Sequence, residues 1–280
     1  QIALRSSDEA SFCPRSYQYQ FPILVQQLLL FFPEEEATIR SYCNKIQEIC
    51  NSFPLYNLNI GGGYQQEILS INAKQYLDDL TQNEKLKAVL AGTNFLYAGI
   101  PDKTPLYVHA LSVDSYIKSA HRCIKGGSQI TKQLINQIRK FGGEVYKHSE
   151  VVGFEFENEK LIGAKTKNGK TYFADLFISN IELKTTLKLV GEEKFRKPFY
   201  KRIQGLEPSP SAFSIYIVFK PESFKYINHN YYHFNDSKKV WQAMDYTQES
   251  WPEAYMLSMN LSHENQVWAE SLTAITYMHF

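Results

Sequence analysis

The sequence lacks an excess of charge of either sign. Its 280 residues include 30 Lys and Arg against 29 Asp and Glu, which gives a formal net charge of +1. A nucleic-acid partner normally requires a strongly basic surface. The composition therefore argues against binding to nucleic acid, and it indicates no specific protein partner.

Paired cysteines are also missing. The four cysteines, at positions 13, 43, 50 and 123, form no C-x-x-C unit and have no zinc-ligand spacing. Cys43 and Cys50 lie two turns apart on a predicted helix, which is too far for a disulfide. We predict that all four are buried or inert thiols in a reducing compartment.

No hydrophobic run is long enough to cross a membrane. The most apolar stretch, FPILVQQLLLFF (21–32), is interrupted by two glutamines. It falls short of the roughly 20 residues that a spanning helix needs. We expect a cytoplasmic protein, with peripheral contact to a membrane left open.

Both ends of the sequence indicate that the protein continues beyond them. The first residue is Gln1, not Met, and the last ten, SLTAITYMHF, form an apolar, strand-like run without a polar tail. We therefore expect this chain to be the central fragment of a longer protein.

Helical patterns dominate residues 1–121. Pro33 and the glutamates that follow predict a helix start. The apolar stripe of that helix consists of Ile39, Tyr42, Cys43, Ile46, Ile49, Cys50 and Phe53. The stretch 71–92 predicts two helices that are broken near Asn83 and closed by Gly92.

The segment KGGSQITKQLINQIRKFGGE (125–144) predicts another amphipathic helix. Its apolar residues recur at spacings of three and four: Ile130, Leu134, Ile135, Ile138 and Phe141. Ser128 is the predicted N-cap. Arg139 and Lys140 suit the negative end of the helix dipole, and Gly142 or Gly143 is expected to close the helix.

Strand patterns follow this helix. Residues 157–160 and Asn168-Gly169 predict turns within a meander. Residues 175–178 predict a strand that leads into Ser179-Asn180, and two helices are expected over 181–204. Alternation over 209–221 predicts a further strand, and the remainder is aromatic and strand-like. The predicted fold class is α+β with mixed sheets.

Local motifs assign no catalytic or metal-binding residue. Neither Gly61–Gly63 nor Gly126–Gly127 belongs to a G-x-G-x-x-G unit, and no G-x-S-x-G motif is present. His229 and His233 stand four apart, but they lack a third ligand at a suitable spacing. We therefore predict no metal site and leave the catalytic residues unknown.

The order of motifs from Gly126 to Gly191 nevertheless resembles a known family. Gly-Gly-Ser precedes an amphipathic helix, followed by Gly-Gly-Glu, a strand ending at Val151, the Asn168-Gly169 hairpin, Ala174-Asp175 and Ser179-Asn180. This order resembles the phytoene desaturase, carotenoid isomerase and retinol saturase-like FAD oxidoreductases.

The resemblance implies an α+β flavoenzyme with two domains. Residues 1–121 and 192–280 correspond to a substrate domain with helices over a mainly antiparallel sheet. Residues 122–191 correspond to the middle of an FAD-binding α/β domain, with Gly126–Gly127 as the entry into it. Val151, Ser179 and Asn180 are the implied cofactor-binding positions, and backbone groups at Val151 would face the adenosine end of FAD.

Two family segments are absent from the sequence. These are the N-terminal G-x-G-x-x-G unit and the C-terminal segment that closes over the flavin. The resemblance implies a parent enzyme that desaturates, saturates or isomerises a lipophilic polyene or isoprenoid-like substrate, with this chain alone inactive. The alternative is a non-enzymatic protein on the same scaffold that binds lipid or prenylated proteins.

Overall fold

The chain forms two compact units. The computed structural model describes residues 20–59, 66–118, 126–207, 209–262, 264–265 and 267–278. Residues before 126 and from 210 onward make the first, which we call the helix–sheet unit, and residues 126–209 make the middle unit. Helices and antiparallel sheets occur together, which confirms the α+β fold class. The predicted boundary after residue 191 lies inside the middle unit, and its functional assignment stays a prediction.

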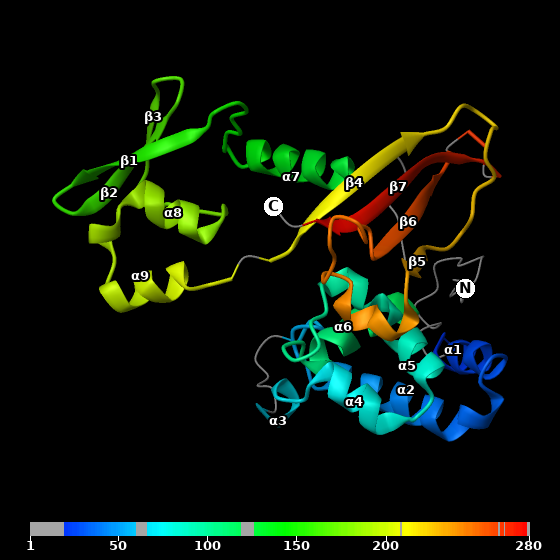
Figure 1. Cartoon of the computed structure of the whole chain (residues 1–280). Coiled ribbons are helices and arrows are strands. Elements are labelled where there is room, and N and C mark those ends of the chain that lie inside the picture. The colour runs from blue at the N-terminus through cyan, green and yellow to red at the C-terminus, as the bar shows by residue number, and fades with distance from the viewer. Residues whose placement is uncertain are drawn as a thin grey trace. The chain divides into compact units, whose positions relative to one another are not determined.

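Helices form one layer of the helix–sheet unit (Figure 1). They are α1 (Gln20–Leu29), α2 (Glu36–Asn51), α3 (Gln66–Leu69), α4 (Ala73–Leu80), α5 (Glu84–Ala91) and α6 (Leu106–Lys118), with 3-10 turns at Pro33–Glu35, Gly92–Tyr97 and Ser237–Gln242. The predicted stripe of α2 is confirmed, because its members are buried apart from Phe53, which is partly buried. The Gly61–Gly63 run lies outside the described residues.

A buried polar cluster crosses the helical layer. His109 on α6 is completely buried. The hydroxyl of Tyr42 lies 2.8 Å from its Nε2, and the hydroxyl of Tyr97 lies 2.7 Å from its Nδ1. Burial lowers the pKa of His109 to about 4. The neutral imidazole therefore links Tyr42 on α2 to Tyr97 in the 3-10 turn Gly92–Tyr97.

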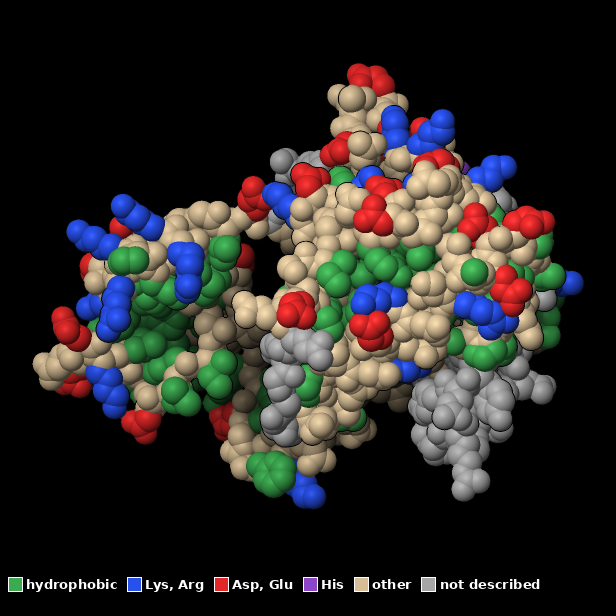
Figure 2. All heavy atoms as spheres, turned by 90° about the horizontal axis from the view of Figure 1, so that it is seen from below, with side chains coloured by type: hydrophobic (Ala, Val, Ile, Leu, Met, Phe, Trp, Pro, Cys, Tyr) green, Lys and Arg blue, Asp and Glu red, His purple; other side chains and the backbone are tan. Residues whose placement is uncertain are grey.

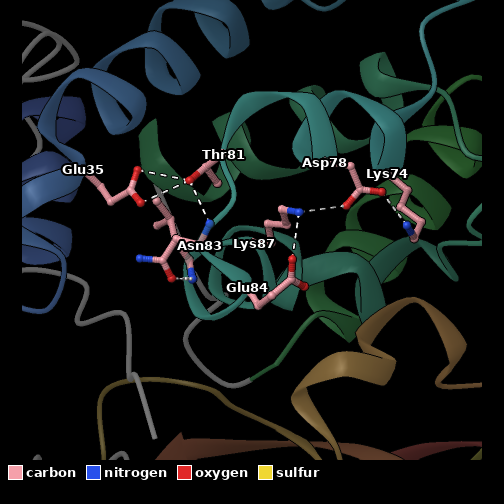
Figure 3. Close-up of polar contacts among 8 residues, drawn as sticks. Glu35, Lys74, Asp78, Thr81, Asn83, Glu84 and Lys87 are labelled. Atoms are coloured by element: carbon pink, nitrogen blue, oxygen red, sulfur yellow. Dashed lines mark hydrogen bonds and ion pairs between the residues drawn. The ribbon is translucent and has the colours of Figure 1, made fainter.

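Polar contacts fix the turn between α4 and α5 (Figure 3). The Thr81 hydroxyl donates to the Glu35 carboxylate at 3.1 Å and accepts from the Asn83 backbone N–H at 3.1 Å. The Asn83 side chain in turn accepts from the backbone N–H of Leu86 at 3.2 Å. Asn83 thus caps α5, and the predicted break in the helix pair is confirmed.

Loss of the Asn83 cap has a measurable expected effect. Substitution Asn83→Ala should lower the free energy of unfolding by about 1 kcal/mol, because one N–H of the first turn loses its acceptor. Asn83→Ser should retain most of the stability. Urea unfolding monitored by tryptophan fluorescence reports this unit, since Trp241, Trp251 and Trp268 all lie in it. Equal stability of the alanine and serine variants would contradict the capping role.

The second layer is a four-stranded antiparallel sheet in the order β4-β7-β6-β5. Its strands are β4 (Ser211–Val218), β5 (Tyr231–Phe234), β6 (Ala254–Leu261) and β7 (Ala269–Met278). One face, which includes Ala254 and Tyr277, packs against Phe95 and Ala243 of the helical side. Figure 1 shows α1–α6 grouped on one side of this sheet.

The middle unit combines a three-stranded meander with helices. Its elements are α7 (Ser128–Lys140), β1 (Val151–Glu157), β2 (Lys160–Thr166), β3 (Thr171–Phe173), α8 (Leu183–Val190), a 3-10 turn (Glu192–Lys194) and α9 (Lys197–Gln204). The predicted Asn168-Gly169 hairpin is confirmed, with Gly169 at φ +84°. Gly142, at φ +81°, closes α7 as predicted. The predicted Ser128 cap is wrong: Gly127 occupies the N-cap position, and Ser128 is already helical.

The strand predicted over residues 175–178 is also wrong. These residues pair with no described strand and lie in an irregular segment between β3 and α8. Leu176 and Ile178 are 78% and 89% exposed. An apolar run of this kind forms a strand only when a neighbouring strand supplies hydrogen-bond partners. The sequence pattern showed that residues 175–178 have a propensity for strand, but it did not show whether another strand lies beside them.

The middle unit buries little apolar surface within itself. Among its described residues, only Leu187 and Ile203 are buried hydrophobic side chains. The apolar stripe of α7 is open, with Leu134 60% and Phe141 83% exposed. A stripe of this width on an amphipathic helix normally packs against a core. The middle unit therefore presents an unfilled apolar surface.

This open stripe should bind a hydrophobic dye. Leu134→Lys is expected to reduce the fluorescence of the dye 8-anilinonaphthalene-1-sulfonate by about half or more, because it places charge in an exposed apolar patch. Far-UV circular dichroism should stay unchanged, since Leu134 contributes little to packing. Asn136→Lys adds the same charge off the stripe and serves as the control. Equal dye binding by both variants would contradict an accessible stripe.

Candidate functional site

The start of β1 presents free backbone groups at a sheet edge. The Glu150 carbonyl accepts from the Lys167 N–H at 2.9 Å, and the Thr166 N–H donates to Lys170 at 2.8 Å. Val151 stands opposite Thr166. Because successive residues of an antiparallel strand direct their backbone groups to alternate sides, the N–H and C=O of Val151 are directed away from β2. In the described part of the chain, no strand pairs with this outer edge of β1.

A polar hollow adjoins this edge. It has a volume of about 450 Å³ and is lined by His148, Glu150, Lys167 and Asn168. The ammonium of Lys167 lies 3.1 Å from the Glu150 carboxylate. His148 has φ +53°, an uncommon conformation for a residue with a side chain. The hollow is open to solvent, and its lining combines polar atoms with the apolar parts of these side chains.

Ser179 and Asn180 lie in the exposed segment before α8. The Ser179 hydroxyl lies 2.8 Å from that of Thr186 on α8. The Glu182 carboxylate caps the same helix by accepting from the backbone N–H groups of Lys184 and Thr185 at 2.9 and 2.6 Å. Hydrogen bonds from these backbone groups lower the pKa of Glu182. The segment is therefore attached to the first turns of α8.

The three predicted cofactor positions are linked only indirectly. α8 packs against β1, which carries Val151, and the hydroxyl of Ser179 contacts Thr186 on α8. Among the described residues, no hydrogen bond joins Val151 to Ser179 or Asn180. The sequence motifs gave no sign of the polar hollow, because its lining residues come from the turn before β1 and from the β2–β3 hairpin.

The sheet of the helix–sheet unit has a second face without helical cover. Cross-strand pairs place these side chains on it: Phe213, Ile215, Ile217, Leu257, Leu272 and Ala274. Met259 and Thr276 share this face but are buried, with 4% and 8% exposure, so the face is most open along β4. We call this the open sheet face. The three β4 members are 40%, 48% and 44% exposed. Apolar residues in this arrangement form a platform that suits an apolar ligand.

Polar rings continue the open sheet face at its β5 side. Tyr231 stands opposite Leu257, and His233 stands opposite Tyr255. The His233 and Tyr255 rings stack with centroids 4.6 Å apart. His233 Nε2 lies 3.3 Å from the Asn235 side-chain oxygen. An apolar strip with hydrogen-bonding rings at one end matches a ligand with a long apolar body and one polar end.

Other possible chemistry is limited in the described residues. They contain no group of three or more potential metal ligands. Cys43 and Cys50 are free and buried, as predicted, and burial raises their pKa values to about 11 and about 12. Cys13 and Cys123 lie outside the described residues. No described helix has both the length and the apolar content of a membrane span.

Comparison with known proteins points to one kind of oxidoreductase. The all-trans-retinol 13,14-reductase of Rattus norvegicus is 26% identical over 76% of this chain and 39% of its own length. The proteins of the same name from Danio rerio and Macaca fascicularis are 26% and 24% identical over 69% and 79% of this chain. The predicted family resemblance is confirmed.

The retinol saturase-like relatives are longer than this chain. The chain spans 36% to 40% of the length of the three curated relatives that it matches. No family model matches the chain. Among solved structures, an oxidoreductase from Methanosarcina mazei is 16% identical, with a TM-score of 0.49, over 75% of this chain and 48% of its own. A Pyrococcus furiosus protein is 19% identical, with a TM-score of 0.43, over 74% and 49% of the two chains.

Proposed function

We propose that this chain supplies the central part of a flavin-dependent oxidoreductase that acts on a hydrophobic polyene or isoprenoid-like substrate. The similarity to three all-trans-retinol 13,14-reductases carries this proposal. Their name specifies reduction of a polyene alcohol. The corresponding reactions for this protein are saturation, desaturation or isomerisation of a conjugated chain.

The middle unit is the proposed FAD-contacting part. Adenine offers an acceptor nitrogen beside an amino donor. The outward N–H and C=O of Val151 supply the complementary pair on one residue, so the free edge of β1 fits this group. The exposed Ser179 and Asn180 side chains add hydrogen-bonding groups near the start of α8. When bound, the flavin would supply the two-electron redox chemistry.

The helix–sheet unit is the proposed substrate part. Its open sheet face would hold the apolar body of the polyene and exclude water from it. Tyr231, His233 and Tyr255 would orient a terminal hydroxyl by hydrogen bonding. Four strands span about 14 Å across the sheet, given a spacing of about 4.8 Å between neighbours. This width suits an elongated substrate that lies across the strands.

A chimera tests the cofactor part of the proposal. The matched region of the Rattus norvegicus relative is replaced by the matched residues of this chain, and folding is verified by circular dichroism. The chimera is expected to be yellow with bound FAD, whereas the 280-residue chain alone should show no turnover, because its sequence lacks the G-x-G-x-x-G unit.

Two variants of the chimera locate the contact. Val151→Pro removes the outward N–H and should therefore weaken FAD binding at least tenfold. The fold should persist, because proline is tolerated at a free strand edge. Val151→Ala keeps the backbone groups and should bind within about twofold of the parent. A folded chimera that binds retinol but no flavin would favour the lipid-binding alternative instead.

A further inference from the structure

The imidazole of His233 has a fixed plane on the open sheet face. It stacks on the ring of Tyr255, with centroids 4.6 Å apart and an angle of 22° between the two planes. The two residues stand opposite each other on β5 and β6. A stacked imidazole keeps its plane, but a half-turn of the ring still exchanges each nitrogen with a carbon position. A second contact must therefore determine where each nitrogen lies.

Asn235 supplies this second contact. Its backbone N–H donates to the Glu253 carbonyl at 2.9 Å, and its side-chain Nδ2 donates to the Pro252 carbonyl at 2.9 Å. Because the amide nitrogen is held in this way, the amide oxygen is the atom directed at the imidazole, and it lies 3.3 Å from Nε2 of His233. An amide oxygen can only accept a hydrogen bond, so Nε2 is the nitrogen that carries the proton.

This arrangement leaves an acceptor at Nδ1 of His233. A neutral imidazole has one N–H nitrogen and one nitrogen with a lone pair, and here the lone pair belongs to Nδ1. Within the described ranges of the chain, no group donates a hydrogen bond to Nδ1. The side chain of His233 shares the open sheet face with Leu257 and Tyr255. Nδ1 is therefore an oriented acceptor at the polar end of this face.

We propose that Nδ1 of His233 accepts a hydrogen bond from the polar end of the ligand, and that Asn235 is the positioning residue that holds the imidazole for this contact. The inference rests on the proposed function, in which the open sheet face holds a polyene. It adds a direction to the contact, because the ligand donates and the protein accepts. Tyr231 and Tyr255 hydroxyls can act in either sense, so His233 is the group that selects a ligand with an O–H.

Two ligands that differ only in this donor test the role of His233. They are all-trans-retinol and its methyl ether, titrated into the chain and followed by quenching of tryptophan fluorescence. Wild type should bind retinol about fivefold more tightly, which is the typical effect of one hydrogen bond between neutral groups. His233→Phe keeps a ring against Tyr255 without an acceptor, so it should bind the two ligands equally.

His229→Phe is the matched control for His233→Phe. The ring of His229 contacts that of Tyr231 at 4.7 Å on the same strip of polar rings. Its replacement should leave the preference for retinol unchanged. A preference that persists in His233→Phe would arise from the bulk of the methyl group and would overturn the proposal.

Asn235→Ala tests the positioning role. Without the anchored amide the imidazole is free to turn, so the preference for retinol should fall to about twofold, while the affinity for the ether stays unchanged. In a His233→Phe background, Asn235→Ala should have no further effect, because Asn235 acts through the imidazole. Equal losses of affinity for the two ligands would overturn this role.

The same titrations separate this inference from the proposed function. Saturable binding of both ligands by wild type with equal affinity would overturn the role of His233 and leave the polyene site intact. Absence of saturable binding for either ligand would overturn both.

Discussion

The free energy of unfolding of the helix–sheet unit is expected to fall by about 3 kcal/mol, through His109 alone, as the pH falls from 6.5 to 4. Burial lowers the pKa of the folded imidazole to about 4, against 6.5 for an unperturbed histidine. Between these values the unfolded chain binds a proton that the folded chain does not bind. The stability is therefore complete above pH 6.5 and is lost progressively towards pH 4.

A matched variant separates His109 from the carboxylates. His109→Gln keeps a donor and an acceptor between Tyr42 and Tyr97 but does not titrate. Urea unfolding at a series of pH values, followed by tryptophan fluorescence, should give a flatter profile for this variant than for wild type, by about 3 kcal/mol over the interval. Parallel profiles for the two proteins would contradict the buried, neutral imidazole.

Truncation of Ile46 is expected to cost about 3 kcal/mol of stability in Ile46→Ala. Ile46 lies on α2 with 0% exposure and belongs to the main core of the helix–sheet unit. Removal of buried methylene and methyl groups loses their transfer free energy and leaves a cavity, which together cost about 2 to 5 kcal/mol. The midpoint of urea unfolding should shift accordingly.

Leu30→Ala is the control for this core truncation. Leu30 is 72% exposed in the same unit and reports through the same fluorescence signal. Its truncation should change the free energy of unfolding by no more than about 0.5 kcal/mol. Similar losses for both variants would show that α2 is not the centre of the core.

The local elements were largely predictable from the sequence. The stripe of α2 and the break near Asn83 follow from residue spacing and capping chemistry, both of which act within a few residues. Residues 175–178 show the limit of this reasoning, since a strand exists only with a neighbour, and local sequence does not specify one. Ser128 shows a smaller limit: Gly127 takes the cap position one residue earlier.

The candidate site was less predictable than the fold. Val151 was identified by resemblance, but the direction of its backbone groups depends on the pairing of Glu150 with Lys167 across the hairpin. The open sheet face depends on strands far apart in sequence, because β4 pairs with β7 and β5 pairs with β6. The sequence showed that the C-terminal part is aromatic and strand-like, but it did not show which of these side chains share a face.

Binding of all-trans-retinol to this chain tests the central claim most directly. Titration followed by quenching of tryptophan fluorescence is expected to give saturable binding, and Trp251 lies close to Phe213 at a ring distance of 5.7 Å. Ile217→Asp places a charge on the open sheet face and should weaken binding at least tenfold. Val218→Asp places the same charge on the other face of β4 and should bind like wild type. Equal binding by the two variants, or no binding by wild type, would contradict the open sheet face as the polyene site.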